Sequence, residues 1–327
     1  MAKVLVTGAT GFVGSHLTRR LLDDGHEVSI LVRPTSNYYR PELAGAQVCT
    51  GDVTDRSSVY KAVYGVDTVY HLAAIFRKAK FPDSVYWDTN YGGTYNILEA
   101  CADSGVRRLV HCSTVGVLGH IQNPPADETA PYSPGDVYQR SKCEAEQEVL
   151  NFNKTGKLSA VVIRPAGVYG PGDTRWLKLF KSIAHKRFAM LGSGKTFIHM
   201  VYISDLVNAF LLAAESPNAP GRVYIAGDER YVTLNEVAST IANAVGVRTP
   251  WAHFPVGPVR FASGICEDIC RALGVEPPIF RRRVDFFVKS RAFDISRAKS
   301  ELGYSPKVHL DEGVSQTAAW YKEHGLI

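Results

Sequence analysis

The sequence predicts an α/β fold, a Rossmann-type doubly wound parallel sheet with a smaller C-terminal substrate-binding lobe. Three observations indicate this class. Short apolar runs rich in Val, such as KVLVT at 3–7, alternate with segments of helical periodicity through the first half of the chain. A glycine-rich turn, TGATGFVG, follows the first of these runs directly. Around Pro165 the alternation gives way to RPAGVYGPGD, a Gly- and Pro-rich stretch typical of a loop.

The elements of the first half follow one another in strand-helix-strand order. The first helix carries apolar residues at helical spacing and stops at Gly25; these residues are Phe12, Val13, Leu17, Leu21 and Leu22. Further strands are expected at 27–32, 46–52, 68–74, 108–114 and 159–165, and further helices at 88–105 and 136–153. Repeated units of this kind predict a parallel sheet covered on both faces.

The change of pattern near Pro165 places the expected domain boundary. We expect residues 1–165 to form an NAD(P)-binding Rossmann domain, completed by segments near 200–227 where strand and helix patterns return. Residues 166–199 and 228–327 should form the substrate-binding lobe.

The lobe has helical patterns of its own. TLNEVASTIANAVG predicts a helix with Thr233 as N-cap and Glu236 three residues on, which is a capping box. RFASGICEDICRALG places an apolar stripe on one helix face, made of Ala262, Ile265, Cys266, Ile269 and Leu273. Such a stripe could contact a membrane or an apolar substrate, but packing against its own domain is the expected role.

Composition excludes several classes of protein. The chain has 327 residues, 45% apolar and 21% charged, as in a globular protein, and a net charge of +5 without a concentrated basic tail. We therefore expect a small-molecule substrate and no nucleic-acid partner. No apolar run approaches the roughly 18 residues of a membrane span, and the first strand follows the initial Met so closely that we expect no signal peptide. Six cysteines without paired spacing predict no metal site and a reduced, cytoplasmic protein.

The glycine-rich turn carries the first functional signal. Gly8, Gly11 and Gly14 allow a tight turn, close approach of the backbone to a pyrophosphate and close helix-sheet packing. The following helix offers free N–H groups and a positive dipole end to the phosphates. The expected cofactor contacts of this turn are Gly8, Thr10, Gly11, Phe12, Val13 and Gly14.

The end of the second strand favours one dinucleotide over the other. A carboxylate at this place binds the ribose hydroxyls of NAD, whereas an arginine accommodates the 2′-phosphate of NADP. The chain reads LVRPTSN, with Arg33 and no carboxylate. This favours NADP(H), with NAD(H) as the alternative.

A tyrosine and a lysine four positions apart, Tyr138 and Lys142, suggest proton transfer. A spacing of four places both side chains on one helix face. An ammonium group next to a phenol stabilises the phenolate, so the hydroxyl can exchange a proton near neutral pH.

Together these motifs resemble the extended short-chain dehydrogenases/reductases over nearly the whole chain. TGATGFVGSHL, GDVTD, HLAA, NYGGTYNILEA, CSTVGVLG, YQRSK and RPAGVYGPGD occur in the order typical of that family. The resemblance implies further cofactor contacts at Asp52, Val53, Leu72, Ala73, Ala74, Asn90, Pro165 and Val168, besides Tyr138 and Lys142. It also implies that Thr114, with Ser113 as the fallback, acts with Tyr138 on the substrate oxygen while Lys142 binds the cofactor ribose.

Departures from the family pattern bear on the substrate. Val115 and Gly116 replace the acidic pair of the nucleotide-sugar dehydratases, so dehydration is not expected. Ile198 and His199 stand where sugar-nucleotide epimerases usually carry Arg and Asp. The basic run Arg281, Arg282 and Arg283 lies close to where the same enzymes hold a second phosphate-binding arginine, so these residues are candidate substrate contacts.

The expected function is reversible, NAD(P)-dependent hydride transfer at a secondary alcohol or ketone, as a net oxidoreduction or as half of an epimerisation. A nucleotide sugar is narrowly the preferred substrate. The alternative is an apolar alcohol or ketone, as in the 3β-hydroxysteroid dehydrogenase and dihydroflavonol reductase branches, which the C-terminal part resembles. A cofactor-binding regulator without catalysis is the alternative of another class. By resemblance, the helices at 84–103 and 136–153 would pair in a homodimer.

Overall fold

The computed structural model describes the chain except residues 37, 77–80, 262–263 and 265–280. The apolar stripe of 262–273 therefore lies outside the described residues. Arg281, Arg282 and Arg283 begin a helix, but their side chains also lie outside the described part.

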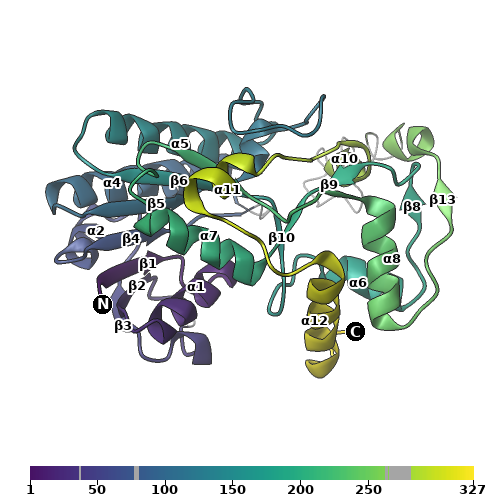
Figure 1. The fold of residues 1–327 in the computed structure, drawn as a ribbon, viewed down its shortest axis with the longest axis horizontal. Helices are drawn as coiled ribbons and strands as arrows, with labels where there is room; N and C mark the ends of the chain where they lie inside the picture. The colour runs from purple at the N-terminus through teal and green to yellow at the C-terminus, as the bar shows by residue number, and fades with distance from the viewer. Residues whose placement is uncertain (37, 77–80, 262–263, 265–280) are drawn as a thin grey trace.

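A seven-stranded parallel sheet forms the core of the first part of the molecule, in the order β11-β6-β5-β4-β1-β2-β3 (Figure 1). Its strands are β1 (Lys3–Thr7), β2 (Glu27–Val32), β3 (Gln47–Thr50), β4 (Thr68–His71), β5 (Arg108–Cys112), β6 (Ala160–Pro165) and β11 (Val223–Ala226). Every residue of β4 and β6 is buried, as expected of parallel strands covered on both faces. The predicted Rossmann-type fold is confirmed.

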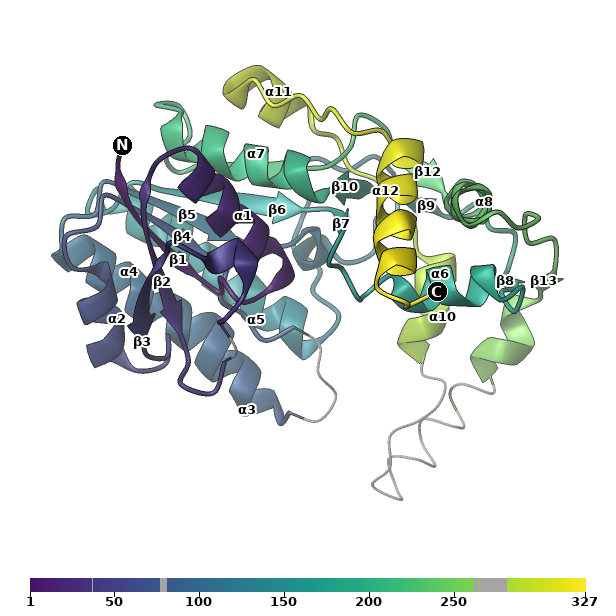
Figure 2. The ribbon, with the colours of Figure 1, turned by 90° about the horizontal axis from the view of Figure 1, so that it is seen from below.

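Helices cover the two faces of this sheet (Figure 2). One face carries α1 (Phe12–Asp23) and α7 (Ile203–Glu215), and the other carries α2 (Arg56–Val63), α4 (Gly93–Asp103) and α5 (Val137–Lys154). Short elements join them: η1 (Pro41–Leu43), α3 (Asp83–Tyr86), η2 (Trp87–Gly92) and η3 (Val115–Leu118). The strand order reverses between β1 and β4, and ligands of such sheets bind at the carboxyl ends of the strands beside this reversal.

The second part packs beside the carboxyl ends of the strands as a smaller lobe (Figures 1 and 2). Its short strands are β7 (Gly167–Tyr169), β8 (Met190–Leu191), β9 (Phe197–Ile198), β10 (Met200–Tyr202), β12 (Val232–Thr233) and β13 (His253–Phe254). Its helices are α6 (Leu177–Ala184), α8 (Leu234–Val245), α10 (Arg281–Val288) and α12 (Leu310–Glu323). The predicted capping box is present at the start of α8.

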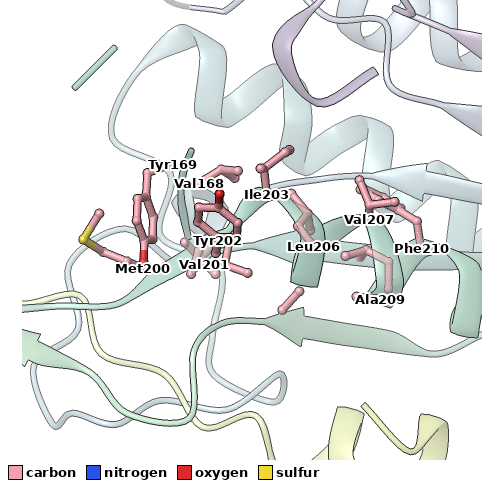
Figure 3. Packing of buried hydrophobic residues seen from close by; sticks show 14 of the residues in the cluster. Val168, Tyr169, Met200, Val201, Tyr202, Ile203, Leu206, Val207, Ala209 and Phe210 are labelled. Atoms are coloured by element: carbon pink, nitrogen blue, oxygen red, sulfur yellow. The ribbon is translucent and has the colours of Figure 1, made fainter. Parts of the chain in front are cut away.

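One apolar cluster continues from the sheet into the lobe. Side chains of β7, β10 and α7 interlock there, among them Tyr169, Tyr202 and Phe210 (Figure 3). Asp205, at the start of α7, accepts the backbone N–H groups of Lys307 and Val308 and so fixes the C-terminal segment. The remaining helix, α11 (Ser296–Leu302), contacts α7 and β11 on the Rossmann side.

Candidate active site

The glycine-rich turn follows β1 and leaves no room for side chains. Gly8 has a φ of +74°, and a Cβ atom there would lie 2.7 Å from the backbone nitrogen of Ala73. At Gly14 a Cβ atom would lie 2.2 Å from the carbonyl oxygen of Gly8. Helix α1 then begins at Phe12 without a side-chain cap and without an acidic residue in its first turn. The turn can therefore accept an anion against backbone N–H groups.

A cavity of about 750 Å³ opens at the ends of β2 and β3. It brings together the expected cofactor contacts Arg33 and Asp52 and residues of the α3–α4 region. The lining residues are Arg33, Asp52, Thr54, Ile75, Phe81, Val85, Asp88, Thr89, Tyr91, Gly92, Tyr95 and Asn96. Its position is the one expected for the adenosine end of a dinucleotide, with one cationic side chain, Arg33, and two carboxylates, Asp52 and Asp88, on its wall.

Other expected cofactor contacts have less direct access to this cavity. Val53 is buried against Gly93, where a Cβ atom would lie 2.7 Å from Val53 Cγ2. The Val168 carbonyl accepts hydrogen bonds from Arg175 Nη2 and Trp176 Nε1, so it fixes the loop after β7.

A buried chain of hydrogen bonds supports the backbone that follows β4. The Ala73 N–H donates to Thr7 Oγ1, whose hydroxyl donates to His71 Nδ1 at 2.7 Å. The Thr94 hydroxyl donates to the carbonyl of Asn90, so its oxygen accepts from His71 Nε2, 3.0 Å away. This arrangement fixes a neutral imidazole, and desolvation lowers the pKa of His71 to about 3.

Asn90 extends this network to the helix that carries the Tyr-Lys pair. It lies in η2, a π-helical segment, and is fully buried. Its side chain accepts from the Ile75 N–H and donates to the Ile75 carbonyl and to Ser141 Oγ. A π-helical segment inside a longer helix is often found at functional sites because it redirects one side chain. Here Asn90 fixes the segment beside the cavity.

Tyr138 lies in an apolar pocket at the start of α5. The helix is capped by Asp136, whose carboxylate accepts from the Gln139 N–H. The Tyr138 ring packs edge-on against Phe76, with centroids 5.0 Å apart, and clusters with Ile75 and Tyr86. The ring is thus held in one orientation beside the expected cofactor segment.

Lys142 follows one turn later and is almost completely buried. Its Nζ donates to His111 Nε2 at 3.1 Å. Desolvation lowers the pKa of Lys142 to about 8, with small opposing effects of Cys112 and Glu146. His111 accepts this bond only as a neutral imidazole, and desolvation followed by the charge of Lys142 lowers its pKa well below the usual value. His111 was not predicted from the sequence, because a histidine inside a strand is usually a core residue.

The two hydroxyl candidates after β5 differ in their surroundings. Ser113 is buried and donates to Glu146 Oε2 at 2.5 Å. Thr114 is half-buried, and its oxygen accepts from the Gly116 N–H at 3.0 Å, a bond that does not use the hydroxyl proton. Ser113 therefore belongs to a buried structural network around Glu146. The Thr114 hydroxyl can still donate a hydrogen bond to a substrate.

That network contains a buried ion pair. The Arg164 guanidinium binds Glu146 through Nε and Nη2, with both side chains almost fully buried. The Tyr132 hydroxyl donates to the same carboxylate at 2.8 Å, and its ring lies under the guanidinium. Glu146 lies one turn beyond Lys142 and also accepts from Ser113, so the network joins α5 to β6 and to the residue after β5.

The positions that depart from the epimerase pattern have structural partners. Ile198 is buried in β9. His199 Nε2 donates to the Asp228 carbonyl, and its Nδ1 accepts from the Phe293 N–H. His199 is therefore a neutral structural residue that joins three segments of the lobe. The side chains of the candidate contacts Arg281, Arg282 and Arg283 lie outside the described residues.

Comparison with known proteins decides the family. The model of the "NAD dependent epimerase/dehydratase family" matches residues 4–227. The chain belongs to this family. It is therefore an NAD-dependent enzyme of the epimerase and dehydrogenase type, and the resemblance to extended short-chain dehydrogenases/reductases is confirmed.

Relatives within the epimerase/dehydratase family differ in substrate. The chain is 32% identical to a 3 beta-hydroxysteroid dehydrogenase/Delta 5-->4-isomerase of Mycobacterium tuberculosis, over 98% of this chain and 90% of the relative. It is 31% identical to the N-acetyl-alpha-D-glucosaminyl-diphospho-ditrans,octacis-undecaprenol 4-epimerase of Escherichia coli O157:H7, over 98% and 96%. A solved structure of MoeE5 in complex with UDP-glucose and NAD matches with a TM-score of 0.77 and 26% identity, over 98% and 99%.

The residues present fit a nicotinamide dinucleotide. The turn at Gly8 and Gly14 provides a backbone cradle that side chains would fill, and the cavity beside Arg33 and Asp52 lies at the same edge of the sheet. Among the described residues no group of three or more His, Cys, Asp or Glu side chains could hold a metal ion.

Proposed function

We propose that this protein catalyses reversible hydride transfer at a secondary alcohol or ketone with NADP(H), or alternatively NAD(H). A bound nicotinamide supplies or accepts the hydride. The observation that carries the proposal is the arrangement of Thr114, Tyr138 and Lys142 around one end of α5, next to the segment after β4. The Gly8–Gly14 turn would hold the pyrophosphate and Arg33 the 2′-phosphate.

Each side chain has a separate task in this proposal. Tyr138 exchanges a proton with the substrate oxygen, and its apolar surroundings exclude competing water. Thr114 donates a hydrogen bond to the same oxygen. Lys142 supplies a positive charge one turn from the phenol and so favours its ionised form. His111 accepts a hydrogen bond from the Lys142 ammonium group and so fixes the position of that side chain.

We further propose that the substrate carries a large apolar part. Ile198 offers no charge at a place where an arginine would meet a diphosphate. Two relatives above 30% identity are named for a 3β-hydroxysteroid and an undecaprenol-linked sugar, and both of these substrates have such a part. The nucleotide sugar that the sequence narrowly favoured becomes the second candidate, supported by the neighbour whose structure contains UDP-glucose.

The test compares Tyr138→Phe with the parent enzyme. Removal of the hydroxyl should reduce turnover by about 10²-fold or more, while the dissociation constant of NADPH changes little. Turnover of a 3β-hydroxysteroid is followed by nicotinamide absorbance. Turnover of UDP-glucose is followed by chromatography of the sugar product, because an epimerisation returns the hydride and leaves no net change in absorbance. Unchanged turnover in Tyr138→Phe on an accepted substrate would contradict the catalytic assignment. Activity on UDP-glucose alone would favour the second candidate.

A further inference from the structure

We propose that the outer end of the lobe docks on the surface of an anionic lipid bilayer. The docking surface consists of the exposed aromatic residues Trp251, Phe254 and Phe261 and the exposed cations Lys186, Arg187, Lys195, Arg248 and Arg260. This inference goes beyond the proposed reaction and does not depend on it, because none of these residues contributes to the site of α5.

Three large aromatic side chains extend into solvent within eleven residues of one another. Trp251 is 87% exposed, Phe254 58% and Phe261 73%. Leaving such large apolar side chains in water is unfavourable relative to burying them. Single exposed aromatic residues are common on protein surfaces, but three on one short segment indicate an interaction site. Trp in particular prefers the interface between headgroups and acyl chains.

The charges around these aromatic residues all have one sign along two segments of the chain. Residues 174–204 and 237–261 contain no Asp and no Glu. The parallel pairing of β8 with β13 brings the two segments together, with the Met190 N–H bonded to the Ala252 carbonyl and the Gly192 N–H to the Phe254 carbonyl. The segments that carry the cations before and after β8 therefore lie beside β13 and its flanks.

This surface lies away from the described residues of the Rossmann domain. β13 and the helical residues 256–261 after it form the end of the lobe most distant from the seven-stranded sheet (Figure 1). In Figure 2 the same helix and α10 lie on one side of the lobe, away from α11 and α7. A flat partner could approach there without contacting the Rossmann domain.

A lipid bilayer fits this combination better than a protein or a nucleic acid. Aromatic side chains insert into the boundary of headgroups and acyl chains, while cations are attracted to an anionic lipid surface. A nucleic acid duplex would use the cations but would leave the Trp and the two Phe side chains in water. None of the described helices is long and apolar enough to cross a membrane, so the proposal is attachment to one leaflet.

Flotation of the full-length protein with lipid vesicles tests the proposal. Vesicles of phosphatidylcholine with about 30% phosphatidylglycerol should bind the protein at least roughly 10-fold better than phosphatidylcholine alone, and about 0.5 M salt should weaken binding. The double variant Trp251→Ser, Phe254→Ser should lose about 10-fold or more of the affinity. Tyr64→Ser is the matched control, because Tyr64 is 85% exposed but lies on the Rossmann domain. This control should bind as the parent does.

Each alternative has its own result. The double variant should bind NADPH as tightly as the parent does. Equal NADPH binding would establish that the variant is folded and that its cofactor site is unchanged. Absence of vesicle binding at low salt would overturn the proposal, as would equal binding by the double variant. A change of oligomeric state in the double variant, measured by light scattering without lipid, would assign the surface to a protein contact instead. Loss in the double variant of affinity for a single-stranded DNA that the parent binds, without vesicle binding by the parent, would assign the surface to a nucleic acid and overturn the proposal.

Discussion

Replacing Lys142 with methionine should remove the ammonium charge that the proposed reaction uses. It should also remove the free-energy cost of burying that charge in the folded protein. In water lysine has a pKa of 10.5, whereas desolvation lowers the pKa of buried Lys142 to about 8. Between these values the folded protein binds fewer protons than the unfolded chain, so the free energy of unfolding rises with pH. Below about pH 8 the full penalty is present, and the difference between the two pKa values corresponds to roughly 3 kcal/mol.

Lys142→Met removes this penalty but leaves His111 Nε2 without its donor, which costs about 1–3 kcal/mol. The second cost does not change over this pH window, because the pKa of His111 lies well below it. The difference in free energy of unfolding between variant and parent should therefore move by about 2 kcal/mol between about pH 7 and about pH 9.5, in favour of the parent at the higher pH.

Urea unfolding at the two pH values measures this difference. Lys154→Met is the control, since Lys154 lies on the same helix but is exposed, and its substitution should give a difference that does not vary with pH. A pH-independent difference for Lys142→Met would refute the reasoning, because it would mean that the buried ammonium is not desolvated.

Three further substitutions test the cofactor site and its support. Arg33→Asp should reverse the expected preference for NADP(H) over NAD(H) in binding titrations, and equal affinities in the parent protein would rule out a 2′-phosphate contact. Gly14→Ala should weaken NADPH binding by about 10-fold or more because its Cβ atom meets the turn, whereas Gly257→Ala, which meets nothing within 4 Å, should not. Glu146→Gln should destabilise the protein by about 3 kcal/mol in urea unfolding, because it leaves the buried Arg164 guanidinium without its ionic partner. A loss below about 1 kcal/mol would show that water or Tyr132 replaces the carboxylate.

The sequence by itself determined the sheet, the turn and the Tyr-Lys helix. These are local patterns: buried strands of a parallel sheet are continuous apolar runs, and a turn that cannot hold a Cβ atom must contain glycine. The spacing of Tyr138 and Lys142 follows from the pitch of one helix. The capping box at Thr233 is equally local.

Tertiary structure alone decided what lies around these residues. The pairing of Lys142 with His111 joins two residues 31 positions apart, and the bonding of Ser113 to Glu146 joins two that are 33 apart. Burial of both pairs comes from packing between β5 and α5, which no local pattern records. His199 occupies a motif position in the sequence, yet its bonds to residues 29 and 94 positions away make it structural. Desolvation and long-range hydrogen bonding depend on the assembled layers, and for that physical reason the sequence could name Lys142 but not its environment.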